Sequence, residues 1–416
     1  MLRLSKGKRP QGRIKAQPED FVVEEITKSG VVLETGRRYT KEDLGFEDGP
    51  EGKHSFSVFV MQKRDWNTAS ALREIARKCG RGIKSAGFAG SKDRASISTQ
   101  MCSIFGAMPE RLMEIHVKDI SINGAWESSA GVKLGDLLGN RFSITITEAS
   151  EMERIRSLVE ELNGRFPNYY GEQRFGSRSN NTQVGIAIMK GDFENAAKIF
   201  LTDSLGEKNE EAVTARKRLA EEMDFAEALN YFPWHLKYER MVLESLAQNP
   251  TDYANAIRKL PRAVTLMFVH SVESEIFNRE LEMRVKSNDT HPRKGELSCP
   301  PDKFGYPDLS KTAPSSGNDD QFPVGNIVGY NSESLTEEEA RILGEMGLTK
   351  EDFRVKHMPE LNCKGTYRTL FSPYLNMKTS EGETGTISFS LSAGSYATVL
   401  LDELIDVQES PNITQF

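Results

Sequence analysis

The feature that most constrains the fold of this chain is a change of sequence character in its middle. Stretches with the pattern of a folded core lie near both ends, and a stretch of different character separates them. Strand-like and helix-like patterns occur near both ends, whereas Val184 to Lys259 is charge-rich with helical character. A proline-containing, loop-rich stretch follows after Val285, and core-like sequence resumes near Tyr367. Because 416 residues exceed the size at which one hydrophobic core keeps growing, we expect two or more folding units. The simplest arrangement is a second domain inserted into the first.

The terminal stretches predict strands and helices in mixed order. Asn67 or Thr68 can cap a helix that runs to Cys79, and apolar residues at helical spacing between residues 155 and 162 predict another. A further helix should follow the small, polar residues 392–395. The predicted strands share β-branched, aromatic or alternating residues and cover Phe21–Ile26, Ser55–Met61, Ser85–Ala89, Ala95–Phe105, Phe142–Thr147 and Gly385–Leu391. This order predicts an α+β fold with helices packed against a sheet.

Composition excludes several classes of protein. The sequence has 38% hydrophobic residues but no run of about 18 apolar residues, so it can form cores and no membrane span is predicted. The N-terminus lacks the apolar region of a secretory signal, so we expect a cytoplasmic protein. The six histidines, among them His270, are scattered, and no phosphate-binding loop is found. We therefore expect neither a metal nor another cofactor. The cysteines lie far apart and predict neither a disulfide framework nor a zinc site: Cys79, Cys102, Cys299 and Cys363.

One run of sequence, FAGSKDRASISTQ from Phe88 to Gln100, places a single carboxylate between two cations. Asp93 is flanked by Lys92 and Arg94 in a glycine-started turn between two predicted strands. Flanking positive charge favours the ionised form of a carboxyl group and lowers its pKa, so we expect Asp93 to be an anion at neutral pH. An ionised carboxylate on a turn can act as a nucleophile. Taken alone, the run is equally typical of an ordinary solvated turn.

Three further segments accompany this run in a fixed order. They are GRIKAQPEDFVVEE from Gly12, PNYYGEQRFG from Pro167 and LSAGSYATVLLDELI from Leu391. With the Asp93 run, they resemble the TruD family of tRNA pseudouridine synthases in both order and spacing. The resemblance covers residues 12 to 176 and 366 to 405, while the stretch between matches only loosely.

The resemblance implies a fold and a domain organisation. The fold is the pseudouridine synthase fold, with a central, largely antiparallel sheet flanked by helices and interrupted by an inserted α+β domain. Residues 1–176 and 366–416 would form the discontinuous catalytic domain, and residues 177–365 the insertion domain.

The resemblance also implies the activity, which is the isomerisation of uridine to pseudouridine in tRNA, at position 13. This reaction breaks the bond between base and sugar, turns the base and rejoins it through carbon. No atom is gained or lost, so no redox cofactor is needed. The enzyme must supply an anion near the sugar, an aromatic ring for the freed base and cations for phosphates, and the target base must leave its stack.

Motif matches assign the site residues. Asp93 matches the family's catalytic aspartate; attack on the sugar, attack on the base and removal of a sugar proton all stay open for it. Tyr170 stands where the bacterial members carry Phe, so ring stacking is retained while the added hydroxyl needs a partner or an open site. The predicted substrate-binding residues are Lys15, Lys92, Arg94, Asn168, Tyr170 and Arg174.

The net charge of −7 has the wrong sign for a protein that binds a polyanion, but its distribution is uneven. Basic residues concentrate in residues 1–18 and in Lys63 to Arg94, whereas acids collect in Glu148 to Glu161, in Glu207 to Glu227 and at the C-terminus. We expect one basic face that contacts RNA phosphates. Two alternatives stay open: an RNA-binding module of the same fold without catalysis, and an enzyme of another class such as a nucleotidase, which the lack of metal ligands disfavours. The oligomeric state is not predicted.

Overall fold

The structure is a computed structural model that describes residues 1–45, 55–147, 151–317, 320–380 and 385–407. Its internal contacts divide the chain into two compact units. The sheet unit comprises Arg3–Pro167, Pro301–Asp308 and Phe371–Phe416. The helical unit comprises Met1–Leu2, Asn168–Pro300 and Leu309–Leu370. The domain boundaries implied by the family resemblance stay a prediction.

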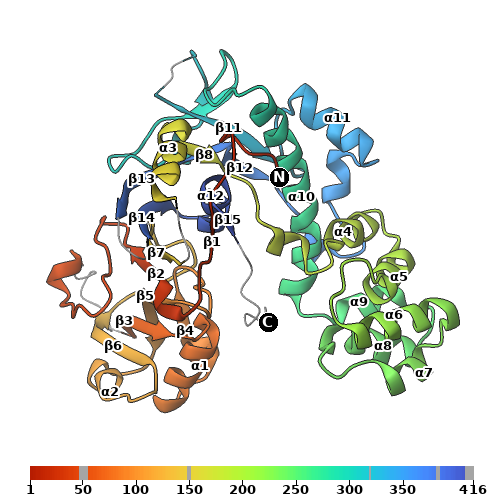
Figure 1. Ribbon diagram of the computed structural model, residues 1–416. Coiled ribbons are helices and arrows are strands. Elements are labelled where there is room, and N and C mark those ends of the chain that lie inside the picture. Colours follow the sequence, from red (N-terminus) through yellow and green to blue (C-terminus); the bar gives the residue numbers. More distant parts are fainter. Residues whose placement is uncertain (46–54, 148–150, 318–319, 381–384, 408–416) are drawn as a thin grey trace. The chain divides into compact units, whose positions relative to one another are not determined.

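A sheet of nine described strands forms the centre of the sheet unit. Its main path has the order β6-β3-β5-β2-β7-β14-β13-β8, and β4 pairs with β5. Only β2 and β5 pair in parallel among these described strands. The C-terminal strands β13 and β14, blue in Figure 1, therefore complete a sheet begun by the N-terminal strands. The strands are β2 (Phe21–Ile26), β3 (Phe56–Arg64), β4 (Ala86–Phe88), β5 (Ile97–Phe105), β6 (Ile120–Ser128), β7 (Gly139–Ile146), β8 (Arg165–Pro167), β13 (Phe371–Ser380) and β14 (Gly385–Ser392).

Helix α1 (Thr68–Lys78) packs against one face of this sheet. Its N-terminus is capped by Asn67, whose side chain accepts a hydrogen bond from the backbone N–H of Ser70. Leu72 and Ile75 of α1 are fully buried with Phe59 of β3. This packing fixes the start of α1 beside the loop that precedes β5. The remaining elements of the sheet unit are the parallel pair β1 (Gln11–Gly12) and β15 (Asp406–Val407), and the helices α2 (Pro109–Met113), α3 (Met152–Leu162) and α12 (Ala397–Leu404).

The helical unit has its own core, built around the long helix α10 (Arg262–Lys286). Val269, Val272 and Ile276 of α10 are fully buried against apolar residues of the surrounding helices. Those helices are α4 (Asn181–Met189), α5 (Phe193–Thr202), α6 (Glu210–Glu222), α7 (Phe225–Tyr231), α8 (Lys237–Gln248), α9 (Tyr253–Arg258) and α11 (Glu337–Glu345). A four-stranded sheet has the order β10-β9-β11-β12, formed by β9 (Leu297–Cys299), β10 (Ala313–Pro314), β11 (Phe322–Ile327) and β12 (Thr366–Thr369).

These elements confirm the predicted α+β class and most of the predicted strands and helices. The stretch after Val285, predicted to be loop-rich, also contains the short strands β9 and β10. Strands of two or three residues, one ending in Pro314, give no alternating pattern that a sequence could reveal. The acidic stretches at 148–150 and 408–416 lie outside the described residues. Within the described part of the chain, no helix combines the length and apolar character needed to cross a membrane.

Candidate active site

The loop that carries Asp93 lies between β4 and β5, and side chains of neighbouring elements hold it by hydrogen bonds to its backbone. The carbonyl oxygen of Asp93 accepts hydrogen bonds from Lys63 Nζ at 2.7 Å and from Ser96 Oγ at 2.9 Å. Thr68, the first residue of α1, accepts a hydrogen bond from the backbone N–H of Lys92 at 2.9 Å. Gln100 of β5 donates to the carbonyl of Gly90 at 2.9 Å. The backbone of the loop is thus fixed independently of the Asp93 side chain.

The carboxylate of Asp93 extends away from this support. Its side chain is 61% exposed, and its Oδ2 lies 3.6 Å from Nζ of Lys15. The Lys15 ammonium also lies 4.2 Å from the ring centroid of Phe21, the first residue of β2. Lys15 has a φ of 58°, in the left-handed region that non-glycine residues rarely adopt. The structure therefore brings Lys15 and Asp93 together at the cost of local backbone strain.

The two cations that flank Asp93 in the sequence point to different environments. Lys92 is buried and forms an ion pair with Glu25 at 2.9 Å, with side-chain exposures of 4% and 1%. The other oxygen of Glu25 accepts a hydrogen bond from the backbone N–H of Met101. Arg94, by contrast, is exposed and pairs with the exposed Asp65 at 3.1 Å. Of the two, only Arg94 presents its charge at the surface.

Lys63 was not identified from the sequence, although it is fully buried beneath the loop. Burial lowers its pKa to about 8, and the negative charge of Asp93 opposes that shift. Lys63 shares the phase of Phe59 and Met61 on β3, both fully buried. A charged residue at an inward position of a strand is the signal that could have revealed it.

A second group of predicted residues belongs to the helical unit. The side-chain amide of Asn168 is buried; its Nδ2 donates to the carbonyl of Thr369 at 3.0 Å, and its Oδ1 accepts from Arg368 at 2.7 Å. The Arg368 guanidinium lies 4.3 Å from the ring centroid of Tyr170, and that of Arg174 lies 5.2 Å from the same ring. Tyr170 thus contacts two cations.

Helix α10 fixes the position of Tyr170. Asn278 of α10 accepts a hydrogen bond from the backbone N–H of Tyr170 and donates one to its carbonyl oxygen, both at 2.9 Å. The Tyr170 ring packs edge-on against Phe277, with the ring centroids 5.7 Å apart. Sequence reasoning missed Arg368, Asn278 and Phe277, because about 100 or more residues separate Asn278 and Arg368 from their partners.

Tyr170 and Arg174 line a cavity of about 340 Å³ within the helical unit, and three further side chains with acid, base or thiol groups line it too: His270, Glu273 and Cys363. Burial raises the pKa of Glu273 to about 7, although the Cys363 thiol and the charge of Arg174 oppose the shift. Burial, and secondarily the charge of Arg174, lowers the pKa of His270. The cavity therefore combines an aromatic ring, a guanidinium and a buried carboxyl group.

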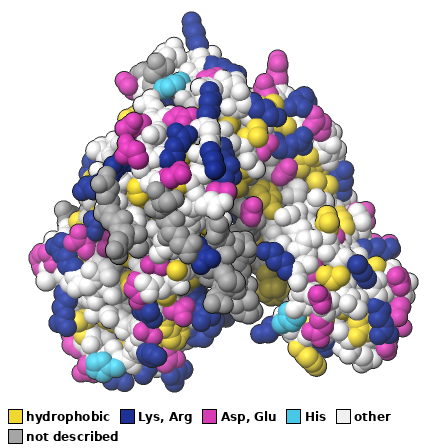
Figure 2. Space-filling model, in the orientation of Figure 1, with side chains coloured by type: hydrophobic (Ala, Val, Ile, Leu, Met, Phe, Trp, Pro, Cys, Tyr) yellow, Lys and Arg dark blue, Asp and Glu magenta, His cyan; other side chains and the backbone are white. Residues whose placement is uncertain are grey.

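The surface charge is mixed on the face that Figure 2 shows, where Lys and Arg side chains lie among Asp and Glu side chains. Part of the basic N-terminal stretch is engaged within the sheet unit. Arg9 pairs with Asp402 and Asp406, both at 3.1 Å, and Arg3 pairs with Asp402 at 3.1 Å. The prediction of one basic face stays a prediction, but Arg9 is not free to bind phosphate in this arrangement.

Comparisons with known proteins give a consistent result. The family model for tRNA pseudouridine synthase D (TruD) matches residues 2–404. A Methanosarcina acetivorans protein named "Probable tRNA pseudouridine synthase D" is 34% identical, over 95% of this chain and 93% of the relative. A Methanopyrus kandleri protein of the same name is 35% identical, over 89% and 90%. A crystal structure described as a TruD from Methanosarcina mazei superposes with a TM-score of 0.76 at 31% identity and covers 97% of this chain and 96% of its own.

Proposed function

This chain belongs to the TruD family of tRNA pseudouridine synthases, and we propose on that basis that Asp93 is the residue that carries out the family's reaction. The activity is the isomerisation of uridine to pseudouridine in tRNA. The observation that supports Asp93 is its geometry: an exposed carboxylate on a rigidly held loop, with the ammonium group of Lys15 3.6 Å away. Position 13 of the tRNA is the target that we propose, on the family resemblance.

The reaction needs an anion that acts at one nucleotide. The bond between C1′ of the ribose and N1 of the uracil breaks, a bond between C1′ and C5 forms, and the C5 proton is lost while N1 gains one. Attack of the Asp93 carboxylate on C1′, its attack on the base and its removal of a sugar proton all require the ionised form. Lys15 lies 3.6 Å from one carboxylate oxygen of Asp93 and aligns the group for the reaction.

The remaining residues of the sheet unit divide into positioning and contact roles. Lys63 and Lys92 hold the loop from within, because their ammonium groups bond to the Asp93 carbonyl and to Glu25. Arg94 is the flanking cation that faces solvent, so it is the one available to an RNA phosphate.

In the helical unit, Tyr170 is the aromatic ring for the extruded base and Arg174 the cation that contacts the RNA. Both line the same cavity. Asn168 acts through Arg368, because its amide groups are occupied by Thr369 and by the guanidinium that lies over the Tyr170 ring.

The test is direct. Unmodified tRNA is incubated with the protein, and pseudouridine is mapped at nucleotide resolution by its specific chemical modification. We expect conversion at uridine 13, no conversion by Asp93→Asn with tRNA binding retained, and normal conversion by the control Asp43→Asn, an exposed aspartate elsewhere in the sheet unit. Conversion by Asp93→Asn near the wild-type rate would overturn the role of Asp93, and conversion at another uridine would overturn the target position.

A further inference from the structure

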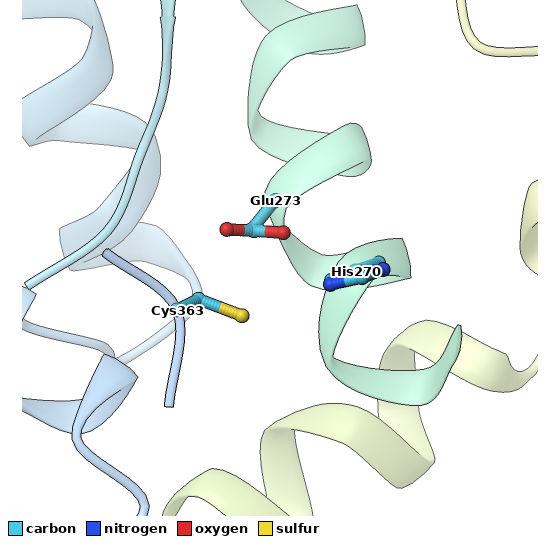
Figure 3. A group of neighbouring side chains, drawn as sticks. All are labelled: His270, Glu273 and Cys363. Carbon is cyan, nitrogen blue, oxygen red and sulfur yellow. The ribbon is translucent and has the colours of Figure 1, made fainter. Parts of the chain in front are cut away.

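Three side chains with different metal-binding atoms converge in the helical unit, outside the residues assigned to the reaction. His270 and Glu273 lie one turn apart on α10, and Cys363 lies in the segment that leads into β12. Their candidate ligand atoms all lie within 4.8 Å of one another. Figure 3 shows the thiol and the imidazole pointing toward one another, with the carboxylate beside both. Helical spacing of three residues explains why the first two share a face.

The carboxyl group of Glu273 is the buried member of this cluster that most needs a strong partner. Glu273 is only 7% exposed, and among the described residues the cation whose charge acts on it is Arg174, whose influence on the pKa of Glu273 is smaller than that of burial. The Cys363 thiol also lies beside Glu273 and opposes the rise of its pKa, but a thiol is a weak donor, and its single proton is directed to the carbonyl oxygen of Leu361 at 3.6 Å. A carboxylate removed from water without a strong partner is costly, and proteins compensate such groups by a counter-charge or a metal ion.

We propose that His270, Glu273 and Cys363 bind a divalent transition-metal cation, best matched by zinc. Nitrogen, carboxylate oxygen and thiolate sulfur are the donors that zinc accepts. Three protein ligands leave a fourth position, which opens onto the cavity that the three residues line. That position would take water or another small donor, as in other zinc sites with three protein ligands.

The geometry requires a modest contraction. Metal–ligand bonds of about 2.0 to 2.3 Å in a tetrahedron put neighbouring ligand atoms about 3.3 to 3.8 Å apart. The observed upper limit of 4.8 Å is about 1 Å longer, which side-chain rotation can close. The charges also balance, because a thiolate and a carboxylate together neutralise a divalent cation. The charge of Arg174 affects the pKa of both Glu273 and His270, so Arg174 would lie near a site without net charge.

A metal in this place would couple two parts of the helical unit. It would tie α10 to the segment before β12, the strand whose Arg368 and Thr369 bond Asn168. Its consequence is structural: metal binding should stabilise this unit, because only the folded chain presents all three ligands together.

The experiment uses the full chain after dialysis against a chelator, reloaded with Co²⁺ or Zn²⁺. We expect one Co²⁺ per chain with a thiolate-to-cobalt charge-transfer band, and a higher Tm for the helical unit with Zn²⁺. Cys363→Ser should abolish the band, and His270→Gln should weaken metal affinity at least about tenfold. The control Cys299→Ser, at another buried cysteine of the same unit, should leave band and affinity unchanged.

Two results would overturn the proposal. One is a protein that shows neither the band nor stoichiometric metal. The other is a band lost equally in Cys299→Ser and Cys363→Ser. His270→Gln guards against a folding failure of Cys363→Ser, because His270 is only half-buried and its replacement leaves the core intact.

Discussion

Two carboxylates of this protein lie in opposite environments. Asp93 in the sheet unit is largely exposed, with Lys15 beside its oxygens and Lys63 and Lys92 beneath its backbone. Glu273 in the helical unit is buried, and burial outweighs the charge of Arg174 in setting its pKa. The first can reach substrate from the solvent side, whereas burial raises the pKa of the second to about 7, so Glu273 is stable when protonated or bound to a cation.

In the sheet unit, the buried charges of Lys63, Lys92 and Glu25 hold the loop that presents the exposed carboxylate of Asp93. The ion pair of Lys92 with Glu25 and the ammonium of Lys63 are costly to bury, yet they fix the loop from which Asp93 projects. Preorganised groups of this kind are effective because they need no rearrangement when charge develops in the reaction. If these buried groups hold the loop, removing either of them should cost stability in the sheet unit.

The largest effect on stability should follow removal of one partner of the buried pair. Lys92→Met leaves Glu25 buried and uncompensated, so the free energy of unfolding of the sheet unit should fall by about 3 to 5 kcal/mol. Urea unfolding measures this in a Trp234→Phe background, because the remaining tryptophans, Trp66 and Trp126, both belong to the sheet unit.

Two further variants make that result specific. Lys28→Met breaks an exposed pair with Asp136 and should cost less than about 1 kcal/mol. Combining Lys92→Met with Glu25→Leu should recover most of the loss, because no unpaired charge is left. Equal losses from Lys92→Met and Lys28→Met would contradict a structural role for the buried pair.

A somewhat smaller effect, visible only as a function of pH, should come from Lys63. Its pKa is lowered from 10.5 to about 8 in the folded protein, so between these values the unfolded chain binds more protons and stability rises with pH. Below about pH 8 the cost of burying the charge is fully present. The stability of the wild type relative to Lys63→Met should therefore rise by about 3 kcal/mol from pH 8 to 10.5.

Unfolding free energies measured across that range check the prediction. The exposed Lys84 provides the control, because Lys84→Met removes a charge that carries no burial cost and should show no such rise. A flat difference between wild type and Lys63→Met would mean that water reaches this ammonium. Lys63→Met should also lower kcat with KM little changed, since it loosens the loop without touching the substrate.

The contrast between local and distant contacts explains what the sequence could predict. Some features depend only on residues that are neighbours in the sequence, so the sequence predicted them. They are the Asp93 turn, the flanking strands and the cap at Asn67. Lys92 and Glu25 are 67 residues apart and meet only because β2 pairs in parallel with β5. Cys363 is 90 residues from Glu273, which is why the sequence did not show that His270, Glu273 and Cys363 lie close together.

Charge runs were the least informative signal. Arg9 looked like part of a free basic arm, yet it pairs with Asp402 and Asp406 near the opposite end of the chain. A run of basic residues in the sequence shows where positive charge is concentrated, but not which acids pair with it in the fold. Those ion pairs decide whether the charge can reach RNA.

A moderate effect on turnover should distinguish the ring of Tyr170 from its hydroxyl. Tyr170→Ala removes the surface on which the extruded base rests, and base stacking is worth about 1 to 3 kcal/mol. Tyr170→Phe keeps the ring and should stay within about tenfold of wild type, since one hydrogen bond is worth about 1 kcal/mol. Single-turnover rates on the same tRNA measure both, with Tyr238→Ala, an exposed tyrosine of the helical unit, as the control. Equal loss in both Tyr170 variants would assign the chemistry to the hydroxyl.

The smallest effect on stability, and a diagnostic one on binding, should come from Arg94. Its pair with Asp65 is exposed, so Arg94→Gln should change the free energy of unfolding by less than about 1 kcal/mol. If its guanidinium contacts a phosphate, tRNA affinity should fall for all sequences alike, and the slope of log affinity against log salt should flatten by about one. Arg111→Gln is the matched control and should leave the slope unchanged, because Arg111 is an exposed arginine of the same unit that pairs with Glu114 and lies outside the basic stretches expected to contact RNA. The same slope for Arg94→Gln and wild type would show that Arg94 does not touch the RNA, and that the exposed cation beside Asp93 takes no part in binding.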